Sequence, residues 1–343
     1  MANTFFASGA PVHPLPELTS GRILGTWQAD PFGLALIAVL GGLYAWGVIS
    51  LRRRGERWPA GRTAAFAVLG LGMTAVATMS SLAVYDRVLF WPAAVQNITL
   101  DLLAPLGLAL GDPLSLARRA LPARAGERLS RALRGRLVRL LTFPLVSTVL
   151  VLASELCIYF TPYFETALRH EAVHRLMYLQ LLLTGCLFVL PMLSREDMLP
   201  AWCNHPLRAL FVFLDGLVDA VPGIVVMTSG TLIAGGWYGA QHRGWGPAPD
   251  RDQVLGGGLM LAIAELVGLP FLIAVFAEWV RAERMRTAEL DRRLDRESAQ
   301  PHPTVPAAPT APAAPAVSAE LARPWWETDQ GVVGERYRRQ RGA

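Results

Sequence analysis

Two histidines four residues apart carry the most specific chemical pattern in the sequence. The string HEAVH at 170–174 matches HExxH, in which two histidines one helical turn apart bind zinc and the glutamate acts as a base in metalloproteases. No third ligand follows at a recognised spacing, so two alternatives to a protease stay open: a pair that holds zinc or copper, and a pair that binds no metal. Met177, Cys157 and Cys186 are soft ligands that favour Cu(I), although core packing explains each of them equally well. We predict a copper site at His170, His174 and Met177.

Carboxylates inside apolar segments form a second chemical group. Ionisable side chains are costly within a bilayer, and they therefore mark candidate functional sites. At about 1.5 Å of rise per helical residue, Asp219 and Glu265 fall near the middle of the membrane, and Asp215 shares a helix face with Asp219. Two interpretations stay open: protonated carboxylates that hold helices together, or a path for protons or cations. The set comprises Asp101, Glu155, Asp215, Asp219 and Glu265.

The composition places these residues in a membrane protein. The chain has 343 residues, of which 52% are hydrophobic and only 17% are charged, whereas soluble chains carry about 25% charge. A bilayer core requires about 20 apolar residues of helix, and seven such runs occur. We therefore expect an all-α bundle of seven transmembrane helices. The runs are 31–51, 63–85, 88–111, 140–164, 176–194, 209–235 and 254–280.

The arginines predict which way the bundle faces. The sequence contains no lysine, and 26 of its 32 basic residues lie in the segments 52–62, 112–139, 195–208 and 281–343. Basic loops stay on the cytoplasmic side, so we expect the N-terminus outside and the C-terminus inside. The same distribution makes the net charge of +5 a mark of topology and argues against a nucleic-acid partner.

This topology divides the chain into four parts. We expect an extracytoplasmic segment at 1–29, the transmembrane domain at 30–283, a helical extension at 284–299 and a disordered, Pro- and Ala-rich cytoplasmic tail at 300–343. The loop at 112–139 alternates leucines with arginines. It is typical of a basic amphipathic stretch on the inner membrane face, or of a solvated connector held by anionic lipid.

Three strings carry a resemblance to a known family: LDLLAPLGLALGDPLSL at 100–116, FPLVSTVLVLASELCIYFTPYFETALRHEAVH at 143–174 and DQVLGGGLM at 252–260. Together they resemble the CtaG type of cytochrome c oxidase assembly protein of Gram-positive bacteria, over about 30–283. The resemblance implies a multi-pass plasma-membrane protein without enzymatic activity. It implies a metallochaperone-like role in the respiratory chain, at the copper-insertion step, with oxidase subunits or other assembly factors as partners. The absence of lysine fits an actinobacterial genome.

One part of the family pattern is missing. The family's paired histidines on the fifth span match His170 and His174, but a second pair, in a pattern like HMxxH, falls on Ala93 and Asn97. The resemblance thus implies an outer-leaflet copper site of which half remains. Two other functions stay open: a proton- or metal-coupled transporter that uses the intramembrane carboxylates, and a divergent interaction protein that has lost its metal.

Overall fold

A computed structural model describes residues 15–193 and 205–299, and all regular elements within these ranges are helical. The all-α prediction is confirmed for this part of the chain. The predicted tail at 300–343 lies outside the described residues. Contacts divide the chain into two compact units, Met1–Glu283 and Arg284–Ala343. The helices are α1 (Ser20–Gly25), α2 (Pro31–Arg53), α3 (Ala60–Ala64), η1 (Ala65–Leu71), α4 (Gly72–Met79), α5 (Ser81–Tyr85), α6 (Phe90–Ile98), η2 (Thr99–Leu103), α7 (Ala104–Leu110), α8 (Pro113–Ala120), α9 (Ala123–Leu133), α10 (Arg136–Leu141), α11 (Pro144–Phe160), α12 (Tyr163–Arg169), α13 (Glu171–Leu193), α14 (His205–Thr228), α15 (Gly235–Tyr238) and α16 (Pro249–Ala299), with η1 and η2 being π-helical.

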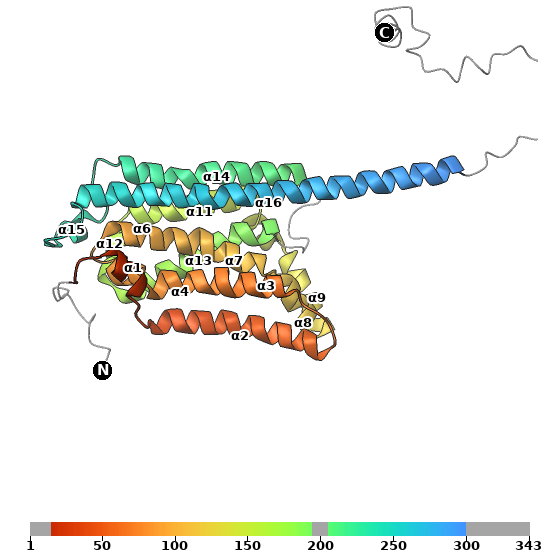
Figure 1. The fold of residues 1–343 in the computed structure, drawn as a ribbon, viewed down its shortest axis with the longest axis horizontal. Helices are drawn as coiled ribbons and strands as arrows, with labels where there is room; N and C mark the ends of the chain where they lie inside the picture. Colours follow the sequence, from red (N-terminus) through yellow and green to blue (C-terminus); the bar gives the residue numbers. More distant parts are fainter. Residues whose placement is uncertain (1–14, 194–204, 300–343) are drawn as a thin grey trace, which may run out of the picture. The chain divides into compact units, whose positions relative to one another are not determined.

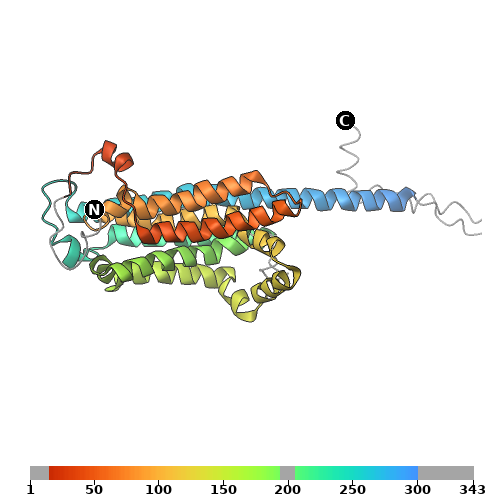
Figure 2. The same cartoon turned by 90° about the horizontal axis from the view of Figure 1, so that it is seen from below.

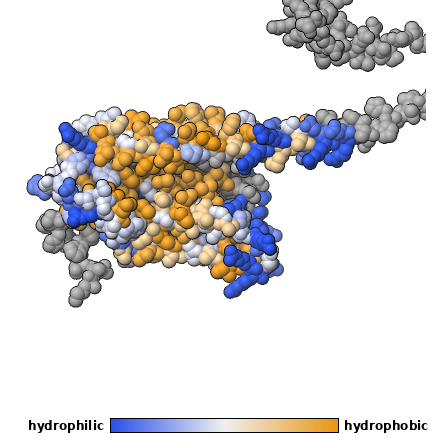
Figure 3. Space-filling view, viewed as in Figure 1, coloured by the Kyte–Doolittle hydropathy of each residue, from blue (hydrophilic) through white to orange (hydrophobic). Residues whose placement is uncertain are grey.

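The long helices of the first unit run side by side as a bundle (Figures 1 and 2). Six helical stretches among the described residues are long and apolar enough to cross a membrane, and the bent pair of α11 and α12 makes a seventh if it counts as one span. Apolar side chains cover the middle of the face shown in Figure 3, with hydrophilic side chains toward both ends of the bundle. We name these ends the α12 end, which also carries α1 and α15, and the α9 end, which also carries α3 and α8 (Figure 1).

The fourth predicted span is not one straight helix. α11 begins at Pro144 and ends at Phe160, and α12 follows at an angle of 64°. Thr161 between them is extended because it precedes Pro162, which disfavours the helical conformation of the residue before it. A hydropathy pattern counts apolar residues and does not register this bend.

Several predicted span boundaries are also wrong, and one of them is the start of the seventh span, because α16 begins at Pro249 rather than 254. α13 begins at Glu171 rather than 176, because an acidic residue in the first turn complements the positive end of the helix dipole. α14 ends at Thr228 rather than 235. Ser229 and Gly230 follow it without helical structure, and Ala234 adopts a left-handed φ of 47° before the short helix α15.

Small residues set the closest helix contacts. A Cβ at Gly185 of α13 would lie 1.8 Å from the carbonyl oxygen of Asp101 in η2, and a Cβ at Gly107 of α7 would lie 2.2 Å from the backbone nitrogen of Gly70 in η1. Helices within a bilayer gain no hydrophobic free energy by associating, and they depend on van der Waals contact instead. Glycines increase that contact because they let two backbones approach closely.

Aromatic rings fill the core toward the α12 end. The ring of Phe90 lies 6.0 Å from that of Phe164 and 5.8 Å from that of Tyr238, both edge to face. Phe164 and Phe90 are 1% and 2% exposed. These contacts tie α6, α12 and α15 together and fix the segments that surround the candidate site.

The approach at Gly185 predicts a large effect of one added methyl group. Gly185→Ala should lower the free energy of unfolding by about 1–3 kcal/mol or more, because α13 and η2 must separate. Gly216→Ala is the control, since a Cβ at Gly216 of α14 has nothing within 4 Å. Thermal unfolding of both variants in detergent measures the difference, and equal midpoints would contradict the predicted packing.

Candidate functional site

Four buried polar residues meet near the α12 end, from three parts of the chain. They are Asp86 after α5, Gln96 of α6, and His174 and Tyr178 of α13, and we call them the His174 cluster. His174 Nε2 lies 2.6 Å from the Tyr178 hydroxyl and 3.2 Å from Asp86 Oδ2. The Tyr178 hydroxyl donates to Asp86 Oδ2 at 3.3 Å, and Gln96 Nε2 donates to the same hydroxyl at 2.6 Å. An imidazole, a carboxylate and a phenol thus converge.

Two atoms of the His174 cluster lack a hydrogen-bond partner among the described residues. They are His174 Nδ1 and Gln96 Oε1, although the two side chains are almost completely buried. Buried polar atoms without a partner are uncommon in folded proteins, and each one is an available site for a ligand or an ordered water. The cluster therefore retains an amide oxygen that can accept a hydrogen bond and an imidazole nitrogen, both without partners in the described structure.

Surrounding contacts hold Asp86 in place. The Tyr238 hydroxyl donates to the Asp86 carbonyl oxygen at 2.6 Å, and the Trp237 indole donates to the Arg87 carbonyl oxygen at 2.8 Å. Burial and the nearby Asp86 carboxylate raise the pKa of the Tyr238 hydroxyl well above its ordinary value. Tyr238 consequently remains a proton donor at neutral pH.

The predicted copper ligands lie in different environments. His170 is exposed and extended between α12 and α13, so the expected placement of both histidines on one helix is wrong for this residue. His174 is buried, and Met177, three residues further along the same helix, is 1% exposed. No group of three or more His, Cys, Asp or Glu residues in the described part of the chain is close enough to hold a metal ion. A site at His174 would need donors of other types, such as the Tyr178 oxygen or the Met177 sulfur.

Glu171, the glutamate of the HExxH pattern, makes ion pairs. It contacts Arg87, and the Nε atom of Arg175 lies 3.1 Å from its Oε1 atom. These pairs connect the start of α13 to the segment after α5. They give Glu171 a structural role beside the His174 cluster.

The positions of the missing histidine pair are both buried. Ala93 packs in the core, and Asn97 Nδ2 donates to the Tyr159 hydroxyl at 3.0 Å. The Oδ1 atom of Asn97 has no partner among the described residues. Polar capacity thus persists at position 97 without an imidazole.

Four of the five predicted carboxylates gather between three spans. Asp101 of η2, Glu155 of α11, and Asp215 and Asp219 of α14 are close enough for their charges to interact, and we call them the carboxylate cluster. The Thr184 hydroxyl donates to Asp101 Oδ1 at 3.0 Å, and the Thr148 hydroxyl donates to Asp215 Oδ1 at 2.5 Å. Glu265 differs, because its side chain is exposed on α16.

Sequence reasoning missed Asp86 and Tyr178. Asp86 lies beside Arg87 in a short connection between two apolar runs, and charged residues are common in such connections. Tyr178 follows His174 by four residues, so the i, i+4 spacing was the available signal. Gln96 directly precedes Asn97, one of the missing histidine positions, and that proximity is its only signal in the sequence.

The fold and these buried polar groups define a multi-pass helical membrane protein. Residues 42–282 match the model of the cytochrome c oxidase caa3 assembly factor family, Caa3_CtaG. The chain belongs to this family, and the predicted resemblance is confirmed.

Relatives of this chain occur in mycobacteria. Uncharacterized protein Mb0105 of Mycobacterium bovis is 31% identical over 288 residues, which is 82% of this chain and 43% of that protein. Uncharacterized protein ML1998 of Mycobacterium leprae is 28% identical over 287 residues, which is 80% of this chain and 42% of that protein. This chain thus spans less than half the length of these curated relatives. No solved structure matches it.

The hydrogen bonds of the His174 cluster predict a stability difference between two tyrosines. Tyr178→Phe should lower the free energy of unfolding by about 1–3 kcal/mol, because Asp86, Gln96 and His174 lose a shared partner in a buried site. Tyr163→Phe removes one hydrogen bond, from its hydroxyl to Gln180 Oε1, and should cost less. Thermal unfolding in detergent compares the two, and a larger loss for Tyr163→Phe would be inconsistent with this network.

Proposed function

We propose that this chain is a non-enzymatic assembly factor for cytochrome c oxidase in the plasma membrane, which holds copper as cargo at the His174 cluster. Membership of the oxidase assembly family is the observation that carries the proposal. The buried pairing of His174 Nε2 with Asp86 Oδ2 at 3.2 Å supports the choice of site, because imidazole and carboxylate are both metal ligands.

The distribution of charge favours an extracytoplasmic position for this site. The α9 end carries the arginine-rich helices α8, α9 and α10, and basic segments stay on the cytoplasmic side. The α12 end, which contains the His174 cluster, is then outside. Copper destined for an oxidase site on that side would reach the cluster without crossing the membrane.

The order of the donors suits a cargo that must be released. His170 is exposed at the start of α13, His174 is buried one turn further, and Met177 lies beyond it within the core. An exposed imidazole exchanges ligands readily with solvent, whereas a buried imidazole and thioether protect the ion from water. The thioether adds preference for Cu(I).

Copper binding to the purified protein tests this arrangement. His174→Ala should weaken copper affinity at least about tenfold, because even partners of ligands affect affinity by this amount. Met177→Leu should also weaken it. Met260→Leu is the matched control, because Met260 is a buried methionine of the same core cluster at 2% exposure.

Cells that carry each variant as their sole copy provide the second measurement. The ratio of copper to haem in the isolated oxidase should fall for His174→Ala and remain normal for Met260→Leu. A full copper content with His174→Ala would overturn the proposal. If Met177→Leu and Met260→Leu bind copper with equal affinity, the Met177 sulfur is not a copper ligand. The result for His174→Ala then decides alone whether His174 holds copper.

A second function is favoured by the carboxylate cluster. Asp101, Glu155, Asp215 and Asp219 come from three spans and are buried or partly buried within the bundle. Carboxylates that share a buried site titrate as a coupled group, and such groups within a membrane are typical of proton paths. The cluster therefore supports proton-coupled transport as the alternative to copper holding, because carboxylates in the described ranges are not grouped closely enough to hold a metal ion.

Transport in proteoliposomes tests this alternative with an internal control. Asp101→Asn and Asp219→Asn should each abolish proton uptake, because an amide neither binds nor releases a proton at neutral pH. Glu265→Gln should leave uptake unchanged, since Glu265 is exposed on α16. Full uptake in both Asn variants would exclude the transport function.

A further inference from the structure

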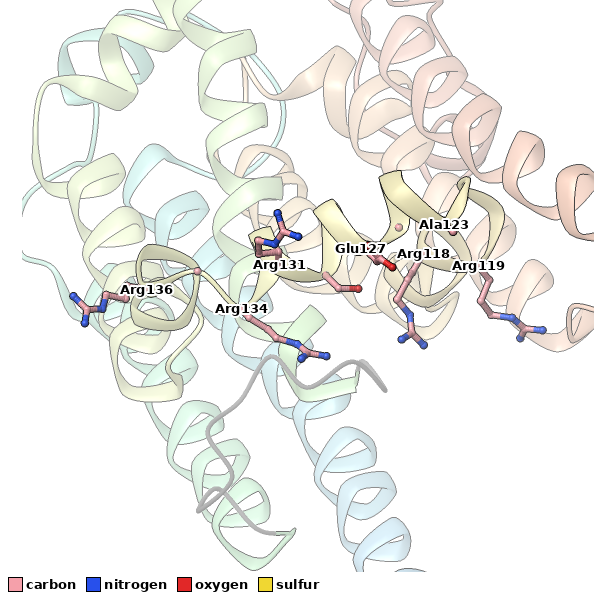
Figure 4. A pocket seen from close by; sticks show the side chains of 10 residues that line it. Arg118, Arg119, Ala123, Glu127, Arg131, Arg134 and Arg136 are labelled. Atoms are coloured by element: carbon pink, nitrogen blue, oxygen red, sulfur yellow. The ribbon is translucent and has the colours of Figure 1, made fainter.

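A pocket of about 980 Å³ lies at the α9 end, formed by three short helices between the third and fourth spans. Figure 4 shows its arginine side chains, which come from α8, from α9 and from the start of α10. A Cβ at Gly126 of α9 would lie 2.9 Å from the carbonyl oxygen of Arg118, so this glycine allows α9 to fold closely against the end of α8. Arg134 and Gly135 then separate α9 from α10.

The pocket rests on a fixed base. At the start of α8, Arg62 Nη1 lies 2.7 Å from Asp112 Oδ2. At the end of α8, the Arg54 guanidinium donates to the carbonyl oxygens of Arg119 and Ala120, at 3.0 and 2.9 Å. Arg119 itself pairs with Glu56 at 2.5 Å. These bonds hold α8 against the loop between α2 and α3.

The lining carries excess positive charge. Five arginines and one glutamate contribute charged side chains to it, and Arg131, Arg134 and Arg136 are exposed. None of their three side chains makes a hydrogen bond or an ion pair with another residue in the described ranges. A pocket of guanidinium groups is complementary to phosphate, which accepts their hydrogen bonds in pairs. The charged lining residues are Arg118, Arg119, Glu127, Arg131, Arg134 and Arg136.

An apolar surface lies directly beside this charge. Leu137 and Leu140 of α10 are 68% and 58% exposed, and α10 contacts α11, the first helix of the next span. A basic helix with exposed leucines lies in the interface of a bilayer, where its apolar side chains reach the acyl region. Figure 2 shows this segment, coloured yellow, at the end of the bundle.

We propose that Arg131, Arg134 and Arg136 bind the phosphodiester headgroup of an anionic phospholipid, whose acyl chains contact Leu137 and Leu140. The pocket supplies charge for the headgroup, and the neighbouring leucines supply the apolar contact. A free phosphate ion would use only the first of these features. This site is independent of copper holding, since it lies at the opposite end of the bundle from the His174 cluster.

Native mass spectrometry of the full chain in detergent tests the proposal with phosphatidylglycerol as the probe and phosphatidylcholine as the neutral comparison. The triple variant Arg131→Gln, Arg134→Gln, Arg136→Gln should bind phosphatidylglycerol at least about tenfold more weakly, because each arginine near an anionic lipid contributes a several-fold factor. The matched control is Arg52→Gln, Arg53→Gln, Arg57→Gln, which removes the same charge from exposed arginines at the end of α2 and in the α2–α3 loop, outside the pocket.

A second variant separates lipid from free phosphate. Leu137→Gln with Leu140→Gln should weaken phosphatidylglycerol binding and leave the binding of inorganic phosphate, measured by calorimetry, unchanged. Equal lipid loss in the two arginine triples would reduce the effect to general charge and overturn the proposal. Phosphate binding with no effect of the leucine changes on lipid would also overturn it, because the pocket would then be a site for a soluble anion. Thermal unfolding confirms that each variant is folded.

Discussion

The contact between the third span and α13 determines most of what is chemically distinctive in this protein. The absence of a side chain at Gly185 brings α13 against the carbonyl oxygen of Asp101. On the same pair of helices, toward the α12 end, Gln96 Nε2 reaches the Tyr178 hydroxyl at 2.6 Å. The His174 cluster and Asp101 of the carboxylate cluster therefore both lie at this interface. A shift of the two helices would disturb the His174 cluster and the carboxylate cluster together.

Burial inside a membrane protein explains why these polar groups are connected. Polar side chains withdrawn from water cost free energy unless they find partners, and neighbouring helices offer those partners: Thr184 for Asp101 and Thr148 for Asp215. The His174 cluster is different, because His174 Nδ1 and Gln96 Oε1 remain without partners among the described residues. Asn97 Oδ1 is also without a partner among these residues. On the proposed function, the unpartnered atoms of the His174 cluster are the ones available to a ligand.

The sequence predicted the fold better than the site. Hydropathy and arginine placement are properties of whole segments, so the spans follow from counting residues. The 64° bend between α11 and α12 does not, because it depends on the local effect of Pro162 on Thr161. The site depends on tertiary proximity: Asp86 and Tyr178 are 92 residues apart, and no spacing rule joins them. Glu265 was grouped with the other carboxylates because a hydropathy window gives depth and does not give the helix face.

Replacement of the missing histidine pair has a physical consequence for the metal that would be held. Two imidazoles at positions 93 and 97 would add nitrogen donors, whereas this chain has Ala93 and Asn97 there and places Asp86 and Tyr178 beside His174. Carboxylate and phenol are harder donors than imidazole, while Met177 in the same core is softer. On the proposed function, the harder set would favour Cu(II) and the thioether would favour Cu(I). On the same proposal, a mixed donor set would bind each oxidation state less tightly than a matched set would, which suits a carrier that must release its cargo.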